Sequence, residues 1–538
     1  MAAPFWKPSI KHTKQELVLL KRLRRTRKLF AFLRDHRDEI FDTGFQDELI
    51  SMYRDSDQGK QPLPPAMLAM AVLLQSYSGV SDAEAVELTV VDLRWQMVLD
   101  RLGSKEPAFS QGALFDFRER LIRHEMDRRF LERTVEVARQ SKAFDWKKLP
   151  KDLRIAMDSS PLVGAGKVED TVNLLAHAAR KVVQCVATLL KWPVERVARE
   201  AGIPLLMASS IKKALDIDWS NPGEQADAVT RLTEQIDALE AWLHEKLPEE
   251  VEKPPLSELL ETLKQILKQD TEPDPSGGGG RRIREGVATD RRISIEDAEM
   301  RHGRKSKTRR FNGYKRHVAT DLDTDLIMAC AVTPANRPEQ EAAAQLDADI
   351  KQQKHRLGEL HIDRGYIKSP VVADVLADHG DVYCKPWRTG FEKLYDKSDF
   401  KMNMRSMTIT CPAGEVKKMQ PGQTVRFDPE SCDICELRPD CTRARLGHGR
   451  SVLIADDEKL QHRLRKRAAS KTGREKLRER VGVEHNLAHL VRRQGPRAKY
   501  TGTRKNLFDV RRASCVQNLE TMQRNLEARS LYPMQMAV

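Results

Sequence analysis

Residues 314–363, YKRHVATDLDTDLIMACAVTPANRPEQEAAAQLDADIKQQKHRLGELHID, decide the fold. The segments Tyr314–Asp321 and Leu326–Thr333 flank a short acidic turn, which predicts two adjacent strands. Pro338–Gln353 follows as a predicted helix, and Leu357–Asp363 is a further apolar strand that ends on an acid. Strands and helices that alternate in this way predict an α/β sheet.

The pattern continues on both sides of this stretch. Upstream, Leu153–Asp158 (LRIAMD) is a predicted buried strand that also ends on an acid. Downstream we predict a helix at Ser369–His379, a strand at Asp381–Lys385 and a long basic helix at Arg474–Arg493. The order strand, strand, strand, helix, strand, helix, strand, helix matches the ribonuclease-H-like topology, a mixed central sheet with helices on its faces.

The first 150 residues are predicted to be helical. Gly79 separates two helices, and Ser81 with Glu84 can form a capping box for the second. A third helix is expected over Gln111–Arg139. Helix, short turn and helix is also the layout of a DNA-binding helix-turn-helix, although an ordinary helical bundle is favoured by the pattern alone.

A second helical region, about residues 172–270, interrupts the predicted sheet. Between Asp216 and Asp274 it has 16 acidic and 5 basic residues, and the glycines Gly277–Gly280 after it predict a flexible joint. We divide the chain into a helical N-terminal domain (1–150), the first part of the core (151–178), a helical insertion (179–280), the second part of the core (281–389), a Cys-rich insert (390–450), and the third part of the core with a C-terminal tail (451–538).

The charge of the chain is concentrated near its end. The 538 residues include 93 Lys and Arg against 79 Asp and Glu, a formal charge of +14, and residues 443–512 alone hold 21 basic and 7 acidic residues. This predicts a polyanionic partner, nucleic acid first. A content of 40% hydrophobic and 32% charged residues argues against both a disordered chain and a membrane protein. The start of the chain lacks a signal-peptide pattern, so we expect a cytoplasmic protein with reduced cysteines.

Three carboxylates occupy special positions in the predicted sheet. Asp158 and Asp363 end the first and fourth strands, and Glu484 lies on the last helix. In a ribonuclease-H-like sheet these positions are neighbours, and converging carboxylates need hard divalent cations such as Mg²⁺. Two such ions serve an in-line phosphoryl displacement. Each acid alone could equally be a turn residue, a helix cap or an ion-pair partner.

Several stretches resemble bacterial insertion-sequence DDE transposases. Residues 153–175 (LRIAMDSSPLVGAGKVEDTVNLL) resemble the region of the first catalytic Asp, and LHIDRGYIKSP resembles the second-Asp motif. RHGRKSKTRRFNGYKRHVATD and VTPANRPEQEAA look like the segment before it, and RERVGVEHNLAHLVRRQGPRAKYTGTRKN looks like the Glu helix. PLPPAMLAMAVLLQSYSGVSDAEAVE resembles the helical N-terminal domain of that group, which implies that residues 1–150 bind DNA ends.

This resemblance implies a catalytic and metal-binding triad of Asp158, Asp363 and Glu484, with two Mg²⁺ or Mn²⁺ ions. Related transposases often show Tyr, Arg, Glu and Lys around the third acid. Arg480 stands at the Arg position, four residues before Glu484. The Tyr and Lys positions hold Leu477 and Val491, which leaves those two roles in doubt.

Four of the eight cysteines are clustered as C-x20-C-x2-C-x5-C. Cys411, Cys432, Cys435 and Cys441 have a spacing that suits one structural Zn²⁺ in a segment rich in turns. His448 could replace one ligand, and four unliganded thiols are the alternative. The other cysteines are expected to be core residues.

Basic side chains near the acids are predicted to bind DNA phosphates. Trp387 and Tyr366 could stack on an exposed base. The predicted DNA-binding residues are Lys305, Lys307, Arg309, Arg310, Lys315, Arg316, Arg364, Arg480, Arg492 and Arg493.

Taken together, these features predict a DDE transposase that cleaves and joins DNA strands at transposon ends. The expected partners are double-stranded DNA, as terminal inverted repeats and target DNA, and a second copy of the chain, with a location at the bacterial nucleoid and no membrane. Two alternatives are a non-catalytic DNA-binding regulator derived from a transposase and a ribonuclease-H-like nuclease that cuts without joining. A serine or tyrosine recombinase is disfavoured, because those enzymes use a hydroxyl nucleophile.

Overall fold

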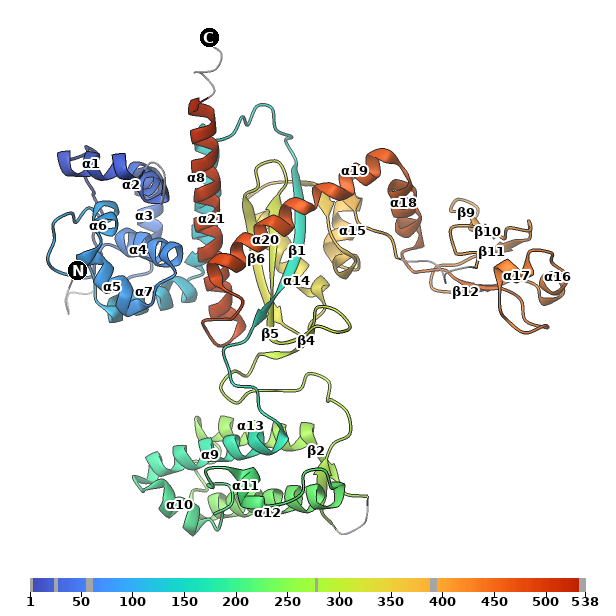
Figure 1. Cartoon of the computed structure of the whole chain (residues 1–538), viewed down its shortest axis with the longest axis horizontal. Helices are drawn as coiled ribbons and strands as arrows, with labels where there is room; N and C mark the ends of the chain where they lie inside the picture. Colours follow the sequence, from blue (N-terminus) through green and yellow to red (C-terminus); the bar gives the residue numbers. More distant parts are fainter. Residues whose placement is uncertain (1–2, 24–27, 55–60, 276–278, 388–393, 532–538) are drawn as a thin grey trace.

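A computed structural model describes residues 3–23, 28–54, 61–275, 279–387 and 394–531 (Figure 1). Two predictions are affected by the gaps. Residues 277–278 of the predicted joint at Gly277–Gly280, and residues 390–393 at the predicted start of the Cys-rich insert, lie outside the described residues. None of the described helices combines the length and the apolar character that crossing a membrane requires.

The N-terminal region is helical, as predicted. It contains α1 (Lys14–Arg22), α2 (Lys28–Ile40), α3 (Thr43–Ile50), α4 (Pro65–Ser78), α5 (Asp82–Val91), α6 (Leu93–Val98), α7 (Gln111–Arg123) and α8 (Met126–Gln140). The turn at Gly79 and the capping box of Ser81 and Glu84 form as predicted. The single helix expected over Gln111–Arg139 is wrong: Glu125 adopts a left-handed conformation with φ 53°, which ends α7 and starts α8.

A mixed sheet lies at the centre of the molecule. Its strands are β1 (Leu153–Val163), β4 (Arg301–Arg304), β5 (Arg310–Asp321), β6 (Ile327–Pro334), β7 (Leu357–His361) and β8 (Asp381–Tyr383). They run in the order β6–β5–β1–β7–β8, and β4 pairs with the beginning of β5. β4, β5, β6 and β1 pair antiparallel, whereas β1, β7 and β8 pair parallel. The predicted α/β class with a mixed sheet is confirmed.

The strand register brings two of the predicted acids level with each other. Ala156 of β1 pairs with His361 of the parallel strand β7. Asp158 and Asp363 each lie two residues beyond this pair, so the two chains carry them to the same edge. β1 continues to Val163 and is longer than the predicted LRIAMD strand, because Ser159–Val163 pair with the first half of β5.

The helices around the sheet differ from the predictions at the C-terminal end. α14 (Glu339–Gln352) and α15 (Pro370–Ala377) lie close to their predicted positions. The single helix expected over Arg474–Arg493 is wrong, since α19 (Lys471–Glu479) and α20 (Val481–Gln494) meet at Arg480. α18 (Glu458–Ala469) precedes them, and α21 (Thr503–Leu531) occupies most of the predicted tail.

α21 joins the N-terminal helices to the sheet. It packs against α8 and α4 on one side and against β6 and α20 on the other (Figure 1). Many of its buried residues are polar, among them Arg511, which donates to Asp127 of α8 and to Asp349 of α14. Asn518 donates to the carbonyl of Ile327 and accepts from its N–H, at 2.9 and 2.8 Å. One continuous hydrophobic core therefore includes both regions.

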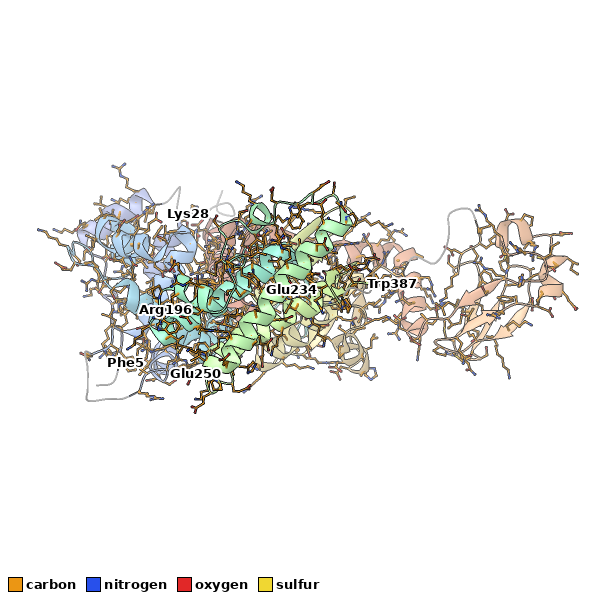
Figure 2. The ribbon with its side chains drawn as sticks, turned by 90° about the horizontal axis from the view of Figure 1, so that it is seen from below. Phe5, Lys28, Arg196, Glu234, Glu250 and Trp387 are labelled. Carbon is orange, nitrogen blue, oxygen red and sulfur yellow. The ribbon has the colours of Figure 1, made fainter. Side chains whose placement is uncertain are left out.

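The helical insertion has a hydrophobic core of its own. It consists of α9 (Thr171–Leu190), α10 (Val194–Glu200), α11 (Ile211–Leu215), α12 (Pro222–Lys246) and α13 (Leu256–Asp270), closed by the short strands β2 (Thr271–Pro273) and β3 (Arg281–Ile283). Seen from below, the insertion with Arg196, Glu234 and Glu250 lies in front of the sheet (Figure 2).

The Cys-rich segment forms a small lobe beyond Trp387 (Figures 1 and 2). It has three short paired strands, β9 (Lys401–Asn403), β10 (Thr408–Thr410) and β11 (Val416–Lys418), a second pair, β12 (Thr424–Arg426) and β13 (Ser451–Leu453), and two helical turns, α16 (Pro429–Asp433) and α17 (Arg438–Cys441). Its small core includes Phe400, Ile409 and Phe427. The exact domain boundaries remain predictions.

Candidate active site

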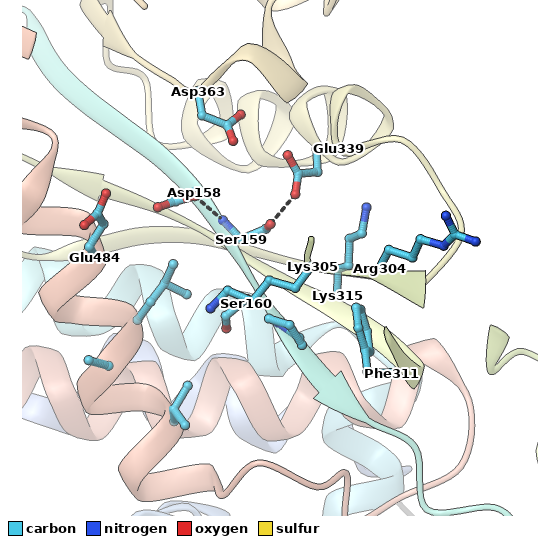
Figure 3. Close-up of a pocket in the computed structure, with 14 residues that line it drawn as sticks. Asp158, Ser159, Ser160, Arg304, Lys305, Phe311, Lys315, Glu339, Asp363 and Glu484 are labelled. Atoms are coloured by element: carbon cyan, nitrogen blue, oxygen red, sulfur yellow. Dashed lines mark hydrogen bonds between the residues drawn. The ribbon is translucent and has the colours of Figure 1, made fainter. Parts of the chain in front are cut away.

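Asp158, Asp363 and Glu484 line one cleft of about 470 Å³ at the edge of the sheet (Figure 3). Asp158 comes from β1, Asp363 from the turn after β7, and Glu484 from the first turn of α20. The three acids are far apart in sequence, and the sheet register together with the position of α20 brings them to one place.

Backbone amides and Arg480 fix the three carboxylates. The Ser159 amide donates to Asp158 at 2.8 Å, and the Gly365 amide donates to Asp363, also at 2.8 Å. Arg480, the residue between α19 and α20, donates to Asp158 at 2.9 Å and to Glu484 at 2.7 Å. The guanidinium therefore bridges two acids that would otherwise repel each other.

Burial and like charge alter the titration of Asp158. The pKa of this carboxyl is raised to about 6, and loss of water contact is the largest cause. The charges of Asp363 and Glu484 also raise this pKa, whereas Arg480 and the Ser159 amide lower it. A carboxylate in such surroundings is stabilised by any additional cation that enters the cleft.

A fourth carboxylate, Glu339, lies in the same cleft and was not predicted. It begins α14, and it accepts a hydrogen bond of 2.5 Å from the Ser159 hydroxyl (Figure 3). Its other oxygen lies so close to Gly365 that a Cβ at that position would clash with it. Glu339 thus touches both the strand that carries Asp158 and the turn that carries Asp363. The one sequence signal was an acid directly after Pro338, at the start of a helix beside the strand ends.

A buried polar chain links the turn after Asp363 to β5 and β6. The Tyr366 hydroxyl is 2.7 Å from Nδ1 of His317, and Nε2 of His317 is 2.9 Å from the Thr333 hydroxyl. Burial lowers the pKa of His317 to about 3, so its ring is neutral. Tyr366 is fully buried, and the prediction that it could stack on a DNA base is wrong. Trp387 is 44% exposed and lies near the guanidinium of Arg364.

The predicted DNA-binding residues fall into two groups. Lys305 and the half-buried Lys315 line the cleft, and Arg364 and Arg480, also half-buried, border a neighbouring pocket. The remaining members of this group are exposed: Lys307, Arg309, Arg310 and Arg492. Arg316 is fully buried and donates to Gln494 and to backbone carbonyls. Arg493 is paired with Glu520 at 2.5 Å. Arg316 therefore cannot contact a phosphate, and the charge of Arg493 is already neutralised. The position of each side chain on its strand or helix decides whether it is exposed, and the basic composition of these segments did not reveal it.

The two positions that depart from the transposase pattern also lie near the site. Val491 lines the cleft, and Leu477 lines the neighbouring pocket beside Arg480. Val491 and Leu477 therefore stand where the family pattern has Lys and Tyr, but their side chains are apolar.

Outside this cleft, the described residues contain one group of side chains whose three potential metal-ligand atoms all lie within 4.8 Å of one another. It consists of Glu359, His361 and Glu479. Arg154 and Lys476 already form ion pairs with both of these acids. Their charges are balanced by protein groups, and we assign no metal there.

The four clustered cysteines line one pocket of the Cys-rich lobe. Cys411, Cys432, Cys435 and Cys441 all contribute to it, together with Phe427 and Arg450. Burial and the charges of the other three cysteines raise the pKa of Cys441, although Arg450 opposes this. The four thiols share this pocket, but no three of their sulfur atoms lie within 4.8 Å of one another, and His448 does not line the pocket. All eight cysteines of the chain are free.

Two protein families match the chain. Residues 21–120 match a family described as Transposase domain (DUF772), and residues 403–523 match a family described as Transposase DDE domain. The second match includes Glu484 and the four clustered cysteines, whereas Asp158 and Asp363 lie before it. Neither a curated protein nor a solved structure matches the chain. Both matched families are transposase families, and their order along the chain, N-terminal helices and then Glu helix, supports an insertion-sequence DDE transposase.

Proposed function

We propose that Asp158, Asp363 and Glu484 are the catalytic residues of this transposase and hold two divalent ions, Mg²⁺ or Mn²⁺. The observation that carries the proposal is the convergence of the three acids in one cleft, from β1, the end of β7 and the first turn of α20. Carboxylate oxygens are the donors that Mg²⁺ prefers. In a two-ion site the ligands of one ion need not lie within contact distance of those of the other.

The strand order and directions support a ribonuclease-H-like core. Three antiparallel strands, β6, β5 and β1, are followed by two parallel strands, β7 and β8. Asp158 lies midway along β1, beside the turn after β7 that carries Asp363. The helical insertion and the Cys-rich insert interrupt this core at loops. We propose the same six parts of the chain as from the sequence, with the helical insertion beginning at α9 and the Cys-rich insert ending with β13.

The reaction is a phosphodiester hydrolysis at the element end, followed by transfer of the released 3′-OH to target DNA. When bound, the divalent ions would stabilise charge on the attacking and leaving oxygens. Asp158 and Asp363 are held by backbone amides, so their oxygens are preoriented. Arg480 holds Glu484 beside Asp158 in the protein alone.

DNA would reach this cleft over the exposed cations around it. Lys305, Lys315 and Arg364 are placed for phosphates next to the scissile bond, and Lys307, Arg309, Arg310 and Arg492 for phosphates further away. We assign recognition of the terminal inverted repeats to the N-terminal helices, in a dimer that pairs two ends.

Replacing Asp363 by Asn tests the catalytic assignment. The variant keeps the side-chain shape and the acceptor for the Gly365 amide, but it lacks the charge. We expect Mg²⁺-dependent cleavage of DNA carrying the native flanks to be lost and end binding to be retained. Cleavage at the rate of the unchanged protein contradicts the assignment.

The same assay separates the alternatives. A strand-transfer product joined to target DNA distinguishes a transposase from a nuclease that only cuts. Binding with no cleavage at any Mg²⁺ or Mn²⁺ concentration is the behaviour of a non-catalytic regulator.

We further propose one structural Zn²⁺ held by Cys411, Cys432, Cys435 and Cys441. Four thiols that share one pocket in a lobe with a small core support this. The purified protein should contain one zinc per chain, measured with a chromogenic chelator after thiol oxidation. A Cys432→Ser, Cys435→Ser variant should lose it, whereas Cys185→Ser, in the helical insertion, should not.

A further inference from the structure

The helices α18 and α19 carry a set of exposed cations that no site described so far uses. Both helices lie between the sheet and the Cys-rich lobe (Figure 1). Six basic side chains on them are exposed: Lys459, Arg463, Lys466, Lys471, Arg474 and Arg478. Here we call these six residues the cationic face.

The sequence spacing gives each helix a single line of charge. Residues 459, 463 and 466 are separated by four and three positions, and residues 471, 474 and 478 by three and four. Such positions lie on one side of a helix. Seven residues span about 10 Å along a helix axis, so each helix presents three cations over that length.

Other cations of the same two helices behave differently. Arg465 pairs with Glu458, Arg467 with Asp381 at the edge of the sheet, and Lys476 with Glu359. These inward side chains balance acids of the core. Within the described residues no acid forms an ion pair with any member of the cationic face, and Glu475 is the one exposed acid on α18 and α19.

The cationic face leads directly to the cleft. α19 ends at Glu479, and the next residue, Arg480, contacts Asp158 and Glu484. On the other side, α18 follows β13 of the Cys-rich lobe. A chain of unpaired charge therefore extends from the candidate active site toward the lobe.

We propose that the cationic face binds the phosphate backbone of duplex DNA that continues away from the cleaved phosphodiester. The inference rests on the proposed function, because it takes DNA to be seated at the three acids. Duplex DNA carries one phosphate per strand about every 3.4 Å of axis, so three cations over about 10 Å meet roughly three phosphates of one strand. Contacts of this kind position the duplex and do not read its sequence.

Salt-dependent binding of a duplex oligonucleotide of arbitrary sequence tests this proposal. Two triple variants remove the lines of charge: K459A/R463A/K466A and K471A/R474A/R478A. The matched control, K213A/K246A/K268A, removes three exposed lysines from the helical insertion and changes the net charge equally. Fluorescence anisotropy over a range of salt concentrations gives the slope of log K against log salt, and circular dichroism checks that each variant is folded.

We expect the slope to become shallower by up to about 2.7 in each triple variant, which is about 0.9 for each phosphate that the protein no longer neutralises. The control should keep the slope of the unchanged protein. If neither triple variant departs from the control, the cationic face does not bind DNA and the proposal is wrong.

The binding readout needs no cleavage, so it is independent of the catalytic assignment. Asp363→Asn should bind with an unchanged slope while losing cleavage. If the triple variants keep the slope of the unchanged protein and Asp363→Asn is inactive, DNA binding by the cationic face is contradicted and the catalytic assignment stands. If the triple variants have shallower slopes and Asp363→Asn still cleaves DNA, the catalytic assignment is contradicted and DNA binding by the cationic face stands.

Discussion

At the scale of single residues, the cleft depends on groups that hold the three acids in place. Glu339 contacts the strand of Asp158 through Ser159 and packs against Gly365 in the turn of Asp363. A group that supports metal ligands in this way typically changes metal affinity or activity by about 10–100-fold when it is removed.

Glu339→Gln should therefore raise the Mg²⁺ concentration needed for half-maximal cleavage by about 10–100-fold. The amide retains the shape and an acceptor for Ser159, and only the charge is lost. Calorimetric titration of Mn²⁺ into the protein provides a readout without cleavage. The control is Glu341→Gln, an exposed acid on the same helix, which should have no effect. Equal ion dependence in both variants contradicts the role of Glu339.

His317 gives the protein a defined pH dependence. Its ring stays neutral in the folded state because burial lowers its pKa to about 3, whereas in the unfolded chain it takes a proton near pH 6.5. Below pH 6.5 the unfolded state binds more protons, so the stability contribution of this group is complete above pH 6.5 and is lost progressively toward pH 3.

Between pH 6.5 and pH 5 the loss from His317 is about 2 kcal/mol. Urea unfolding at pH 7 and at pH 5 measures it. His317→Gln, which keeps polar atoms in the same place, should be less stable at pH 7 but should show a smaller drop between the two pH values. An unchanged drop assigns the pH dependence to other groups.

At the scale of elements, α21 contributes many buried polar side chains to the central core. Asn518 satisfies both backbone groups of Ile327 on β6 and also donates to Thr134 of α8. Replacing it by Leu leaves these groups buried without partners, and each such loss costs about 1–3 kcal/mol.

Asn518→Leu should therefore lower the free energy of unfolding by roughly 2–4 kcal/mol. Asn525→Leu is the matched control, because Asn525 is partly exposed on the same helix and its side chain makes no hydrogen bond among the described residues. Denaturant titration compares the two. Similar stability in both variants shows that the contacts of Asn518 are dispensable.

The same elements explain how far the sequence predicts this structure. The strands next to Asp158 and Asp363 were predictable, because buried strands leave a clear apolar pattern, but the continuation of β1 for five residues beyond Asp158 was not. α21 was not, since Arg511, Asn518 and similar residues look like solvent-exposed positions until their partners, distant in sequence, are known. Arg316 fails for the same reason: it stands in a basic run but pairs with Gln494, 178 residues away.

At the scale of the whole molecule, the N-terminal helices and the sheet share one hydrophobic core, while the helical insertion and the Cys-rich lobe have cores of their own. Elements that share a core tend to open together, and separate cores open independently.

Hydrogen exchange of Asn518→Leu can check this division. Faster exchange is expected both in the sheet and in α4 and α8, because α21 packs against all of them. Exchange in α9–α13 should stay as in the unchanged protein. If the sheet alone becomes faster, the N-terminal helices are an independent unit.

The shared core also has a consequence for how the enzyme chooses its cut. α21 lies against α4 and α8 on one side and β6 and α20 on the other, and α20 holds Glu484. With the proposed catalytic residues, this shared core fixes the distance between the N-terminal helices and the scissile phosphate. If those helices recognise the element end as proposed, an insertion of one base pair between their binding site and the cut would rotate the scissile phosphate away from the three acids.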